Sequence, residues 1–372
     1  MPELRVLHVH SGNMIGGVET LLQTLATHRD LAPGLDQQFA LAFEGTFSTA
    51  LAASGAPTWQ LGAVRTSRPW TVRRGRRALR SLIAELEPAV VVCHAPWAQA
   101  IFGPVVHAAG VPLVFWQHGA VTGKHWLERW ARRARPDLAI TNSRFTASTM
   151  QMLFPNLKPT LLHYPVASRS PGRARADVRQ ALGTAPEATV VIQVSRMEPW
   201  KGQSLLIEAL ARLADVPDWE CWQVGGAQRP EEEIYLDGLR ALAGRLGVTE
   251  RIRFLGHRSD VPDLLSAADV FSQPNAGPEP FGITFIEALY AGLPVVTTRM
   301  GGGEEIVTED CGVLVPPGDI ESLAAALHEL IGDPERRSAL SRAAPARAAE
   351  LCDPATQMAQ LQEIITTTAG TR

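Results

Sequence analysis

Apolar residues in the first half of the chain fall into short runs separated by helix-like stretches. These runs are LRVLHVH (4–10), QQFALAFE (37–44), AVVVCHA (89–95), VPLVFWQH (111–118) and DLAITN (137–142). Such short, nearly continuous apolar runs are typical of strands buried on both faces of a parallel sheet. The stretches between them, such as 17–29 and 72–87, are apolar at helical spacing. This alternation predicts a parallel sheet with helices on both faces.

The pattern stops at residues 165–176, PVASRSPGRARA, whose prolines, serines and arginines have no apolar period and predict a linker. Further strand-like runs follow at 189–195, 219–226, 251–256, 269–274, 293–298 and 311–317, with helical stretches at 202–214, 232–246 and 283–291. The chain is therefore predicted to be α/β, with Rossmann-like domains at 1–168 and 173–350 whose parallel sheets face each other across a cleft. A last helix, about 354–368, either packs on the second domain or crosses back to the first.

Length and composition agree with a globular protein of this kind. The chain has 372 residues, 45% apolar and 20% charged, which suits two domains rather than one core. No apolar run reaches about 18 residues, so no membrane-spanning helix is expected. The first ten residues lack the features of a secretory signal, and the four cysteines are far apart. We therefore expect a cytoplasmic protein.

The charge is distributed unevenly. Residues 1–170 carry 17 Lys/Arg against 9 Asp/Glu, a net +8, while the remainder carries 18 against 29, a net −11. Two basic clusters contain tryptophan: Arg65, Arg68, Trp70, Arg73, Arg74, Arg76, Arg77 and Arg80, and then Lys124, Trp126, Arg129, Trp130, Arg132, Arg133 and Arg135. Such segments can lie on an anionic membrane surface, bind an anionic acceptor or simply be solvated.

The segment from Glu279 to Glu287, EPFGITFIE, follows a predicted strand and begins a helix near Gly282. The first turn offers free N–H groups at about 281–284, and the positive end of the helix dipole favours a phosphate there. Glu287 can accept hydrogen bonds from two ribose hydroxyls, and Glu279 can reach the group on the far phosphate. The alternative is a helix start flanked by two surface glutamates.

Two other strand ends carry candidate ligand-binding residues. Arg196 and Lys201, in SRMEPWKG, can neutralise a diphosphate and stabilise it as a leaving group, or they belong to a solvated basic loop. Gly16 and Gly17 allow a ligand to approach the backbone before a helix, although a Gly-Gly pair is more often only a turn. The segment 12–20 is not a dinucleotide fingerprint.

Histidines mark the ends of three strands of the first domain. His10, His94 and His118 each lie at or near the carboxyl end of a strand, where a substrate is expected, but the pattern does not choose among them. No spacing typical of a tightly held metal is present, nor is a G-x-S-x-G elbow or a P-loop.

Taken together, these motifs resemble the family 4 glycosyltransferases, whose fold is called GT-B. The resemblance is strongest over residues 189–319 and includes FLGH (254–257), GGGEEI (301–306) and GVLVPPGD (312–319) beside the E-x7-E pair. Two features depart from the family pattern: HYPV (163–166) stands where many members have an Asn-Gly turn, and Trp200 adds bulk beside Lys201.

The resemblance implies a role for each site residue. Catalytic roles fall to His118, Glu279, Arg196 and Lys201, with His118 the family's histidine near the donor sugar. Donor-binding roles fall to Gly16, Gly17, Arg196, Lys201, Phe254, Leu255, His257, Glu279, Phe281, Gly282, Ile283 and Glu287. Within that set, Phe254 to His257 would lie beside the base, and Glu287 would bind the ribose. No metal and no tightly bound cofactor is expected.

The implied activity is retaining transfer of a hexose-type sugar from a UDP or GDP donor to a hydroxyl acceptor. Acceptors in polysaccharide, glycolipid or cell-envelope synthesis are consistent with it, as is a peripheral place on an anionic inner membrane surface; nucleic acid is not an expected partner. The alternatives are a nucleotide-sugar epimerase of the same fold and a non-catalytic sugar-nucleotide-binding protein.

Overall fold

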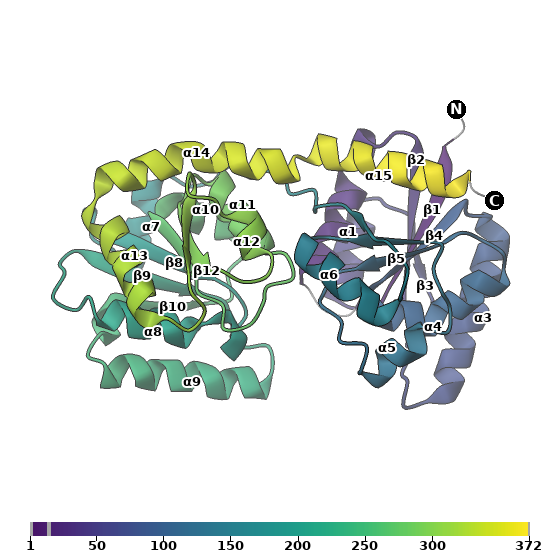
Figure 1. Cartoon of the computed structure of the whole chain (residues 1–372), viewed down its shortest axis with the longest axis horizontal. Coiled ribbons are helices and arrows are strands. Elements are labelled where there is room, and N and C mark those ends of the chain that lie inside the picture. The colour runs from purple at the N-terminus through teal and green to yellow at the C-terminus, as the bar shows by residue number, and fades with distance from the viewer. Residues whose placement is uncertain (1–2, 13–15, 371–372) are drawn as a thin grey trace. The chain divides into compact units, whose positions relative to one another are not determined.

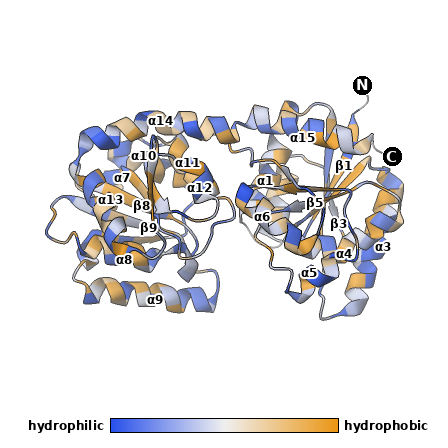
Figure 2. Ribbon diagram, in the orientation of Figure 1, coloured by the Kyte–Doolittle hydropathy of each residue, from blue (hydrophilic) through white to orange (hydrophobic). Residues whose placement is uncertain are grey.

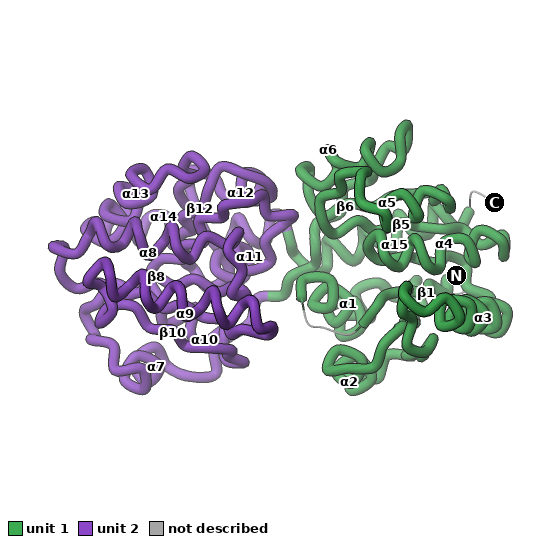
Figure 3. The backbone as a smooth tube through the Cα atoms, turned by 90° about the horizontal axis from the view of Figure 1, so that it is seen from below, with its two compact units in different colours: residues 1–167, 352–372 green, residues 168–351 purple. Residues whose placement is uncertain are grey.

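A computed structural model describes residues 3–12 and 16–370 of the chain. The chain divides into two compact units, residues 1–167 with 352–372, and residues 168–351 (Figure 3). Each unit is built on one sheet whose registered strand pairs are all parallel. The predicted α/β fold with two parallel sheets is confirmed.

The N-terminal unit has a seven-stranded sheet of order β3-β2-β1-β4-β5-β6-β7 (Figure 1). Its strands are β1 Leu4–His10, β2 Leu35–Leu41, β3 Thr58–Gln60, β4 Val90–His94, β5 Leu113–Gln117, β6 Leu138–Thr141 and β7 Thr160–Leu161. Its helices are α1 Gly17–Thr27, α2 Thr46–Ala53, α3 Pro69–Leu86, α4 Ala95–Ala108, α5 Trp126–Ala131, α6 Arg144–Leu153 and α15 Pro354–Ala369, with the 3-10 turn η1 Arg29–Leu31.

Alternation along the strands divides the side chains of this sheet between two faces. Leu7 of β1 and Val91 of β4 share a core cluster with Leu79 of α3 and Ile101 of α4. Since neighbouring residues of a strand point to opposite faces, the even-numbered residues of β1 and β4 lie on the other face. That face carries a row of histidines described below.

The last helix belongs to the N-terminal unit. α15 packs against η1 and β4, and the backbone N–H of Gly34 donates to Oε1 of Gln362 at 2.7 Å. Asp353 caps the helix by accepting a hydrogen bond from the N–H of Thr356 at 2.8 Å. The residues after Leu351 therefore complete a unit that begins more than 300 residues earlier.

The C-terminal unit has a six-stranded sheet of order β10-β9-β8-β11-β12-β13. Its strands are β8 Thr189–Val194, β9 Trp219–Val224, β10 Ile252–Gly256, β11 Val270–Gln273, β12 Val295–Thr298 and β13 Gly312–Val315. Its helices are α7 Arg175–Leu182, α8 Gln203–Ala211, α9 Pro230–Arg245, α10 Val261–Ala267, α11 Ile283–Tyr290, α12 Gly303–Ile306, α13 Ile320–Gly332 and α14 Pro334–Cys352, with the 3-10 turns η2 Pro199–Lys201 and η3 Thr249–Arg251. Hydrophobic strands lie inside each unit and hydrophilic residues line the outer faces of the helices (Figure 2).

The observed strands differ from the predicted runs mainly at their ends. β2 begins at Leu35 rather than at residue 37, because Leu35 pairs with Leu4 of β1. β3 and β7 were not predicted: they are three and two residues long and form by pairing with β2 and β6. Segments this short carry no apolar period, so only their neighbours reveal them.

Candidate functional site

The ends of β8 and β11, adjacent strands of the C-terminal sheet, position the predicted diphosphate-binding residues. After β8 the chain runs through Arg196 and the turn η2 to Gly202, whose φ is +74°. A Cβ on Gly202 would lie 1.8 Å from the carbonyl oxygen of Pro274, just beyond β11. Glycine is therefore required for the η2 turn to pack directly on the β11 loop.

Lys201 and Glu279 meet in an ion pair at this junction. Nζ of Lys201 lies 2.6 Å from Oε2 of Glu279, and the side chains are 14% and 11% exposed. Nε2 of Gln273 donates to the same carboxylate oxygen at 3.2 Å, and Nζ lies 4.0 Å from the ring centroid of Trp200. Two predicted site residues, 78 positions apart in sequence, thus share one largely desolvated contact.

Arg196 has a different carboxylate partner. Its guanidinium lies 3.1 Å from Oε2 of Glu198, which also accepts a hydrogen bond from Nε1 of Trp200 at 3.0 Å. The backbone carbonyl of Arg196 accepts from Nε2 of Gln203 at 2.8 Å. The Arg196 side chain is 39% exposed, so it can exchange Glu198 for an anionic ligand at little cost in desolvation.

The helix α11 begins where an anion site was predicted. Gly282, with φ +109°, precedes Ile283, and its carbonyl accepts from the N–H of Phe285 at 3.0 Å. The N–H groups of Ile283 and Thr284, which precede Phe285 in the first turn, have no acceptor within the helix, and the helix dipole makes this end positive. The side chain of Phe281 is 2% exposed, so this residue can serve a ligand through its backbone only.

A run of three glycines braces the backbone of the Glu279 segment. The N–H of Gly302 donates to the carbonyl of Glu279 at 2.7 Å, and Gly301 forms a parallel bridge with Glu279. A Cβ on Gly302 would lie 2.2 Å from the carbonyl oxygen of Phe281. In the sequence this run was only part of a family pattern; the structure shows that it sets the position of Glu279.

We expect Gly302→Ala to lower the free energy of unfolding by about 2 kcal/mol, because the added methyl group must push the Phe281 backbone away. Urea denaturation followed by circular dichroism measures the loss. Gly238→Ala is the matched control: nothing lies within 4 Å of its Cβ position on α9, so helix propensity should make it neutral or stabilising by up to about 1 kcal/mol. Equal stability of the two variants would contradict the packing role of Gly302.

Two polar residues of the site escaped the sequence analysis. Nε2 of Gln273 donates to Oδ1 of Asn275 at 2.9 Å as well as to Glu279. Both side chains are buried, at 0% and 1% exposed. Their signal in the sequence was present, since DVFSQPN ends an otherwise apolar strand with polar residues. They link the end of β11 to the Lys201–Glu279 pair.

Glu287 lies on α11, and its carboxylate is half-buried. The described residues make no hydrogen bond to this side chain. Burial raises the pKa of Glu287 above its ordinary value, and the positive charge of Arg169 partly offsets the rise. In these surroundings, hydrogen bonds from new donors, such as vicinal hydroxyls, stabilise the ionised form of the carboxylate.

The predicted base-binding residues Phe254, Leu255 and His257 lie at the end of the edge strand β10. β9 separates this strand from β8, which places it about 10 Å away across the sheet. The N–H of Gly225 after β9 donates to the carbonyl of Gly256 at 2.9 Å, so the ends of β9 and β10 are held together. No described contact joins this group to the Lys201–Glu279 pair.

The remaining predicted residues belong to the N-terminal unit. Gly16 is the N-cap of α1 and Gly17 its first residue, while residues 13–15 of the same motif lie outside the described part of the chain. The carbonyl of Gly16 accepts from both the N–H and Oγ1 of Thr20, at 2.9 and 3.0 Å. Farther along α1, Oε1 of Glu19 lies 2.8 Å from Nε2 of His10.

The three histidines left as alternatives by the sequence lie together in the structure. His118 follows β5; its Nε2 lies 2.9 Å from Nδ1 of His94, and its Nδ1 lies 2.6 Å from the hydroxyl of Tyr164. The ring of His10 meets that of His94 edge-on, with centroids 6.2 Å apart. Both ring nitrogens of His118 therefore have partners within the protein.

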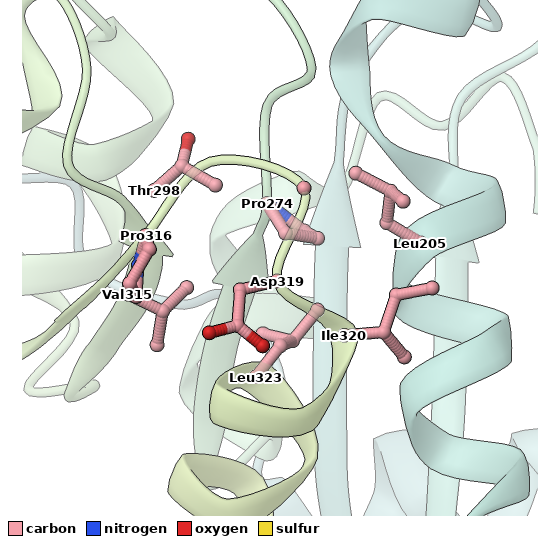
Figure 4. Close-up of a pocket in the computed structure, with 9 residues that line it drawn as sticks. Leu205, Pro274, Thr298, Val315, Pro316, Asp319, Ile320 and Leu323 are labelled. Carbon is pink, nitrogen blue, oxygen red and sulfur yellow. The ribbon is translucent and has the colours of Figure 1, made fainter.

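A small apolar pocket lies beside the ends of β11, β12 and β13 (Figure 4). Its lining includes Pro274, Thr298 and Leu323, and its one carboxylate, Asp319, accepts hydrogen bonds from the N–H and hydroxyl of Ser322 at the start of α13. Because that carboxylate is used as a helix cap, the pocket offers no free charged group to a ligand. Among the described residues no group of three or more His, Cys, Asp or Glu is arranged to hold a metal ion.

Two parallel-sheet units of this topology define the GT-B class of glycosyltransferases. Comparison with known proteins agrees: the model of the glycosyl transferases group 1 family matches residues 174–347. The GDP-mannose-dependent alpha-(1-6)-phosphatidylinositol monomannoside mannosyltransferase of Mycolicibacterium smegmatis is 33% identical over 285 residues, covering 70% of this chain and 72% of that protein. The chain belongs to the group 1 family and is a glycosyltransferase.

Two further relatives extend the comparison. The lipopolysaccharide core biosynthesis glycosyltransferase LpsE of Rhizobium meliloti is 35% identical over 171 residues, covering 46% of this chain and 47% of that protein. The crystal structure of Anabaena HepE in complex with UDP and glucose matches with a TM-score of 0.85 and 26% identity, covering 98% of this chain and all of that chain. The chain spans about half the length of several other curated relatives that it matches.

Proposed function

We propose that the protein is a retaining, family 4 type glycosyltransferase that moves a hexose-type sugar from a UDP or GDP sugar to a hydroxyl acceptor. The observation that carries the proposal is the Lys201–Glu279 pair next to the N-terminus of α11. Lys201, Arg196 and the first N–H groups of α11 bind the diphosphate in this scheme. Glu279 binds the sugar, Glu287 the ribose, and the stretch from Phe254 to His257 lies beside the base.

The chemistry follows from the charges that this site supplies. The acceptor oxygen bonds to the anomeric carbon on the same face from which the diphosphate oxygen departs, and the acceptor proton passes to the leaving diphosphate. The two cations and the helix N-terminus stabilise the negative charge as the bond breaks. No protein base is needed: Glu279 is held by Lys201, and burial keeps the pKa of His118 well below its ordinary value, so its ring is a weak base.

The donor and acceptor classes rest on the relatives. HepE was crystallised with UDP and glucose, and the mycobacterial relative is named as GDP-mannose-dependent, which supports a UDP or GDP sugar as donor. The mycobacterial enzyme is named for a phosphatidylinositol mannoside and LpsE for the lipopolysaccharide core. A glycolipid or cell-envelope saccharide with a free hydroxyl is therefore the acceptor class that we propose.

A thermal-shift panel of nucleoside diphosphates and nucleotide sugars tests the donor site, because a ligand that binds only the folded protein raises its melting temperature. We expect one base to stand out among the diphosphates, and its sugar conjugate then enters a turnover assay. Release of the diphosphate that requires an added acceptor supports transfer. Conversion of the donor sugar without an acceptor would favour an epimerase, and binding without turnover a non-catalytic protein.

The raised pKa of Glu287 predicts a pH dependence of nucleotide binding. The ionised carboxylate accepts the ribose hydroxyls, so affinity for the preferred diphosphate should fall as the pH is lowered through this raised pKa. Calorimetric titration from pH 7.5 to 5 measures the effect. Glu287→Gln should bind the diphosphate more weakly and lose this part of the pH dependence. Arg169→Ala removes the positive charge that lowers the pKa of Glu287, so the fall in affinity should occur at higher pH. Identical profiles for wild type and Glu287→Gln would reject the ribose role.

We also propose that the N-terminal unit contacts an anionic membrane surface through α3. The guanidinium groups of Arg73, Arg74, Arg77 and Arg80 are exposed and make no salt bridge with the described residues, and Trp70 beside them is 66% exposed. The second basic cluster is less available, because Arg132 donates to the carbonyl groups of Met152 and Leu153. No helix in the described part of the chain is long and apolar enough to cross a membrane.

Vesicle sedimentation tests this contact. The protein should bind vesicles containing phosphatidylglycerol and not vesicles of phosphatidylcholine alone. Each basic residue near an anionic surface contributes about 1 kcal/mol, so Arg73→Ser with Arg77→Ser should weaken binding about thirtyfold. The matched control replaces Arg245 and Arg342, exposed arginines on α9 and α14, by serine. An equal loss of vesicle binding in both double variants would show that binding depends only on the net charge of the protein, and would contradict a specific contact through α3.

A further inference from the structure

A row of buried polar side chains crosses the sheet of the N-terminal unit near its carboxyl edge. It runs through His8 on β1, His94 at the end of β4, His118 after β5, Asn142 after β6 and Tyr164 after β7. These strands are neighbours in the order β1-β4-β5-β6-β7, so each member of the row comes from the strand next to that of the previous one. All five residues are at most 7% exposed. Water does not reach these groups, so their hydrogen bonds are made within the protein, and most of them join neighbours in the row.

The three imidazole rings are joined through the same pair of atoms each time. Nδ1 of His8 lies 3.0 Å from Nε2 of His94, and Nδ1 of His94 lies 2.9 Å from Nε2 of His118. Nδ1 of His118 lies 2.6 Å from the Tyr164 hydroxyl. A neutral imidazole has one N–H donor and one acceptor nitrogen. The three rings must then share one tautomer, with every N–H pointing the same way along the row.

The rings are held neutral by their surroundings. Burial lowers the pKa of His8 to about 3 and holds the pKa values of His94 and His118 well below the ordinary range, with repulsion between neighbouring histidines adding to the effect. The other titratable groups that face the row are His10, which is paired with Glu19, and the Tyr164 phenol. A second proton on His94, whose two ring nitrogens both face imidazole nitrogens, would place two N–H groups against each other within the row.

Asn142 indicates which way the donors point. Its Nδ2 lies 3.2 Å from the carbonyl oxygen of His118, which can only accept, and its Oδ1 accepts from Oγ1 of Thr146 at 2.7 Å. The amide orientation is thus determined, and Nδ2 donates to the oxygen of Tyr164 at 3.0 Å. A hydroxyl that accepts a hydrogen bond from an amide becomes a better donor. Nδ1 of His118, 2.6 Å from the Tyr164 oxygen, is an acceptor within reach of this hydroxyl.

We propose that Tyr164 sets the tautomer of His118 as Nε2–H and that His94 and His8 carry the same tautomer, so that Tyr164 and His94 are positioning residues for His118. The donors then run from Tyr164 through His118 and His94 to His8, with Nε2–H of His8 at the far end. In this arrangement His118 neither takes nor gives a proton, and its ring is held from both sides in one orientation. The effect on turnover rests on the proposed function; the tautomer does not.

The wild-type protein tests the tautomer directly. With 15N-labelled histidine, two-bond 1H–15N correlation spectra distinguish Nε2–H, Nδ1–H and doubly protonated rings, and single histidine substitutions assign the signals. We expect Nε2–H for His8, His94 and His118 at pH 7. An Nδ1–H or charged form of His118 would overturn the proposal without any variant or substrate.

Substitutions at the two ends of the row test the direction in which its N–H groups point. Tyr164→Phe removes only the hydroxyl, and we expect a mixture of tautomers at His118 and also at His94, which does not touch Tyr164. His8→Phe removes the far end, and His118 should stay Nε2–H because Tyr164 still donates to it. Tyr235→Phe, which removes a hydroxyl bonded to Gln203 in the other unit, should change neither. Unchanged spectra in Tyr164→Phe, or a change of His118 in His8→Phe alone, would refute the direction.

A kinetic arm links the row to the proposed reaction. We expect kcat of Tyr164→Phe to fall about tenfold, as for loss of a partner that orients a site residue, with kcat unchanged in Lys158→Ala, which removes an exposed lysine of the same unit. A wild-type kcat retained by Tyr164→Phe would reject the positioning role. A wild-type protein with no turnover would reject the proposed function, and the tautomer spectra would still decide on the row.

Discussion

Replacing Lys201 by alanine is expected to reduce turnover about a thousandfold. In the proposed reaction the ammonium group neutralises charge on the departing diphosphate, and loss of one such preorganised group typically costs 10²- to 10³-fold. Affinity for the nucleoside diphosphate should fall with it. Steady-state kinetics with the preferred donor and calorimetric titration of the diphosphate measure the two effects.

The chain offers a matched control for this variant. Lys158→Ala removes an exposed lysine of the N-terminal unit and should leave both quantities unchanged. Lys201→Ala also leaves Glu279 without its cation, so the variant should be less stable, and Glu279→Gln in the same chain should restore part of that stability. Wild-type turnover in a folded Lys201→Ala protein would end the diphosphate assignment.

Glu279→Gln is expected to change turnover and product affinity in opposite directions. In this structure Oε2 of Glu279 lies 2.6 Å from Nζ of Lys201. A diphosphate that binds Lys201 must therefore compete with this carboxylate. Removing the negative charge releases Lys201, and affinity for the free diphosphate should rise about tenfold, because the competing carboxylate belongs to a largely buried ion pair. Turnover should fall about a hundredfold, because the sugar loses the carboxylate that holds it in the proposed reaction.

The opposite signs make this prediction hard to confuse with general damage. Glu220→Gln is the control: Oε2 of Glu220 lies 2.6 Å from Nε of Arg253, and Glu220 lies near the start of β9, at the opposite end of the sheet from the site. That variant should alter neither quantity. A fall in turnover with unchanged diphosphate affinity would show that Glu279 does not compete for Lys201.

The pairing of Lys201 with Glu279 also bears on how a donor enters. A nucleotide sugar brings both a diphosphate for Lys201 and hydroxyl groups for Glu279, so it can replace the ion pair with partners for each side. In the proposed site a free diphosphate satisfies Lys201 only and leaves the buried Glu279 carboxylate with the Gln273 amide but without a cation. If Lys201 and Glu279 have the roles proposed above, the site favours the intact donor over the free diphosphate, which assists product release.

Much of the fold was readable from the sequence, for a simple physical reason. Strands buried on both faces, such as VVVCH at 90–94 and TVVIQV at 189–194, are apolar at almost every position, and the helices between them are apolar every three to four residues. The short edge strands β3 and β7 were missed, because they depend on pairing rather than on their own composition.

The candidate site divides in the same way. The sequence by itself determined which segments follow strands and carry charge, and so singled out 196–202 and 279–287, because the side-chain chemistry and the strand ends are local properties. The tertiary structure alone decided that β8 lies beside β11, which brings Lys201 to Glu279 and leaves Arg196 with Glu198. It alone placed His8, His94, His118 and Tyr164 in one hydrogen-bonded row. Contacts across 78, 86 or 46 residues depend on strand order, which no local pattern encodes.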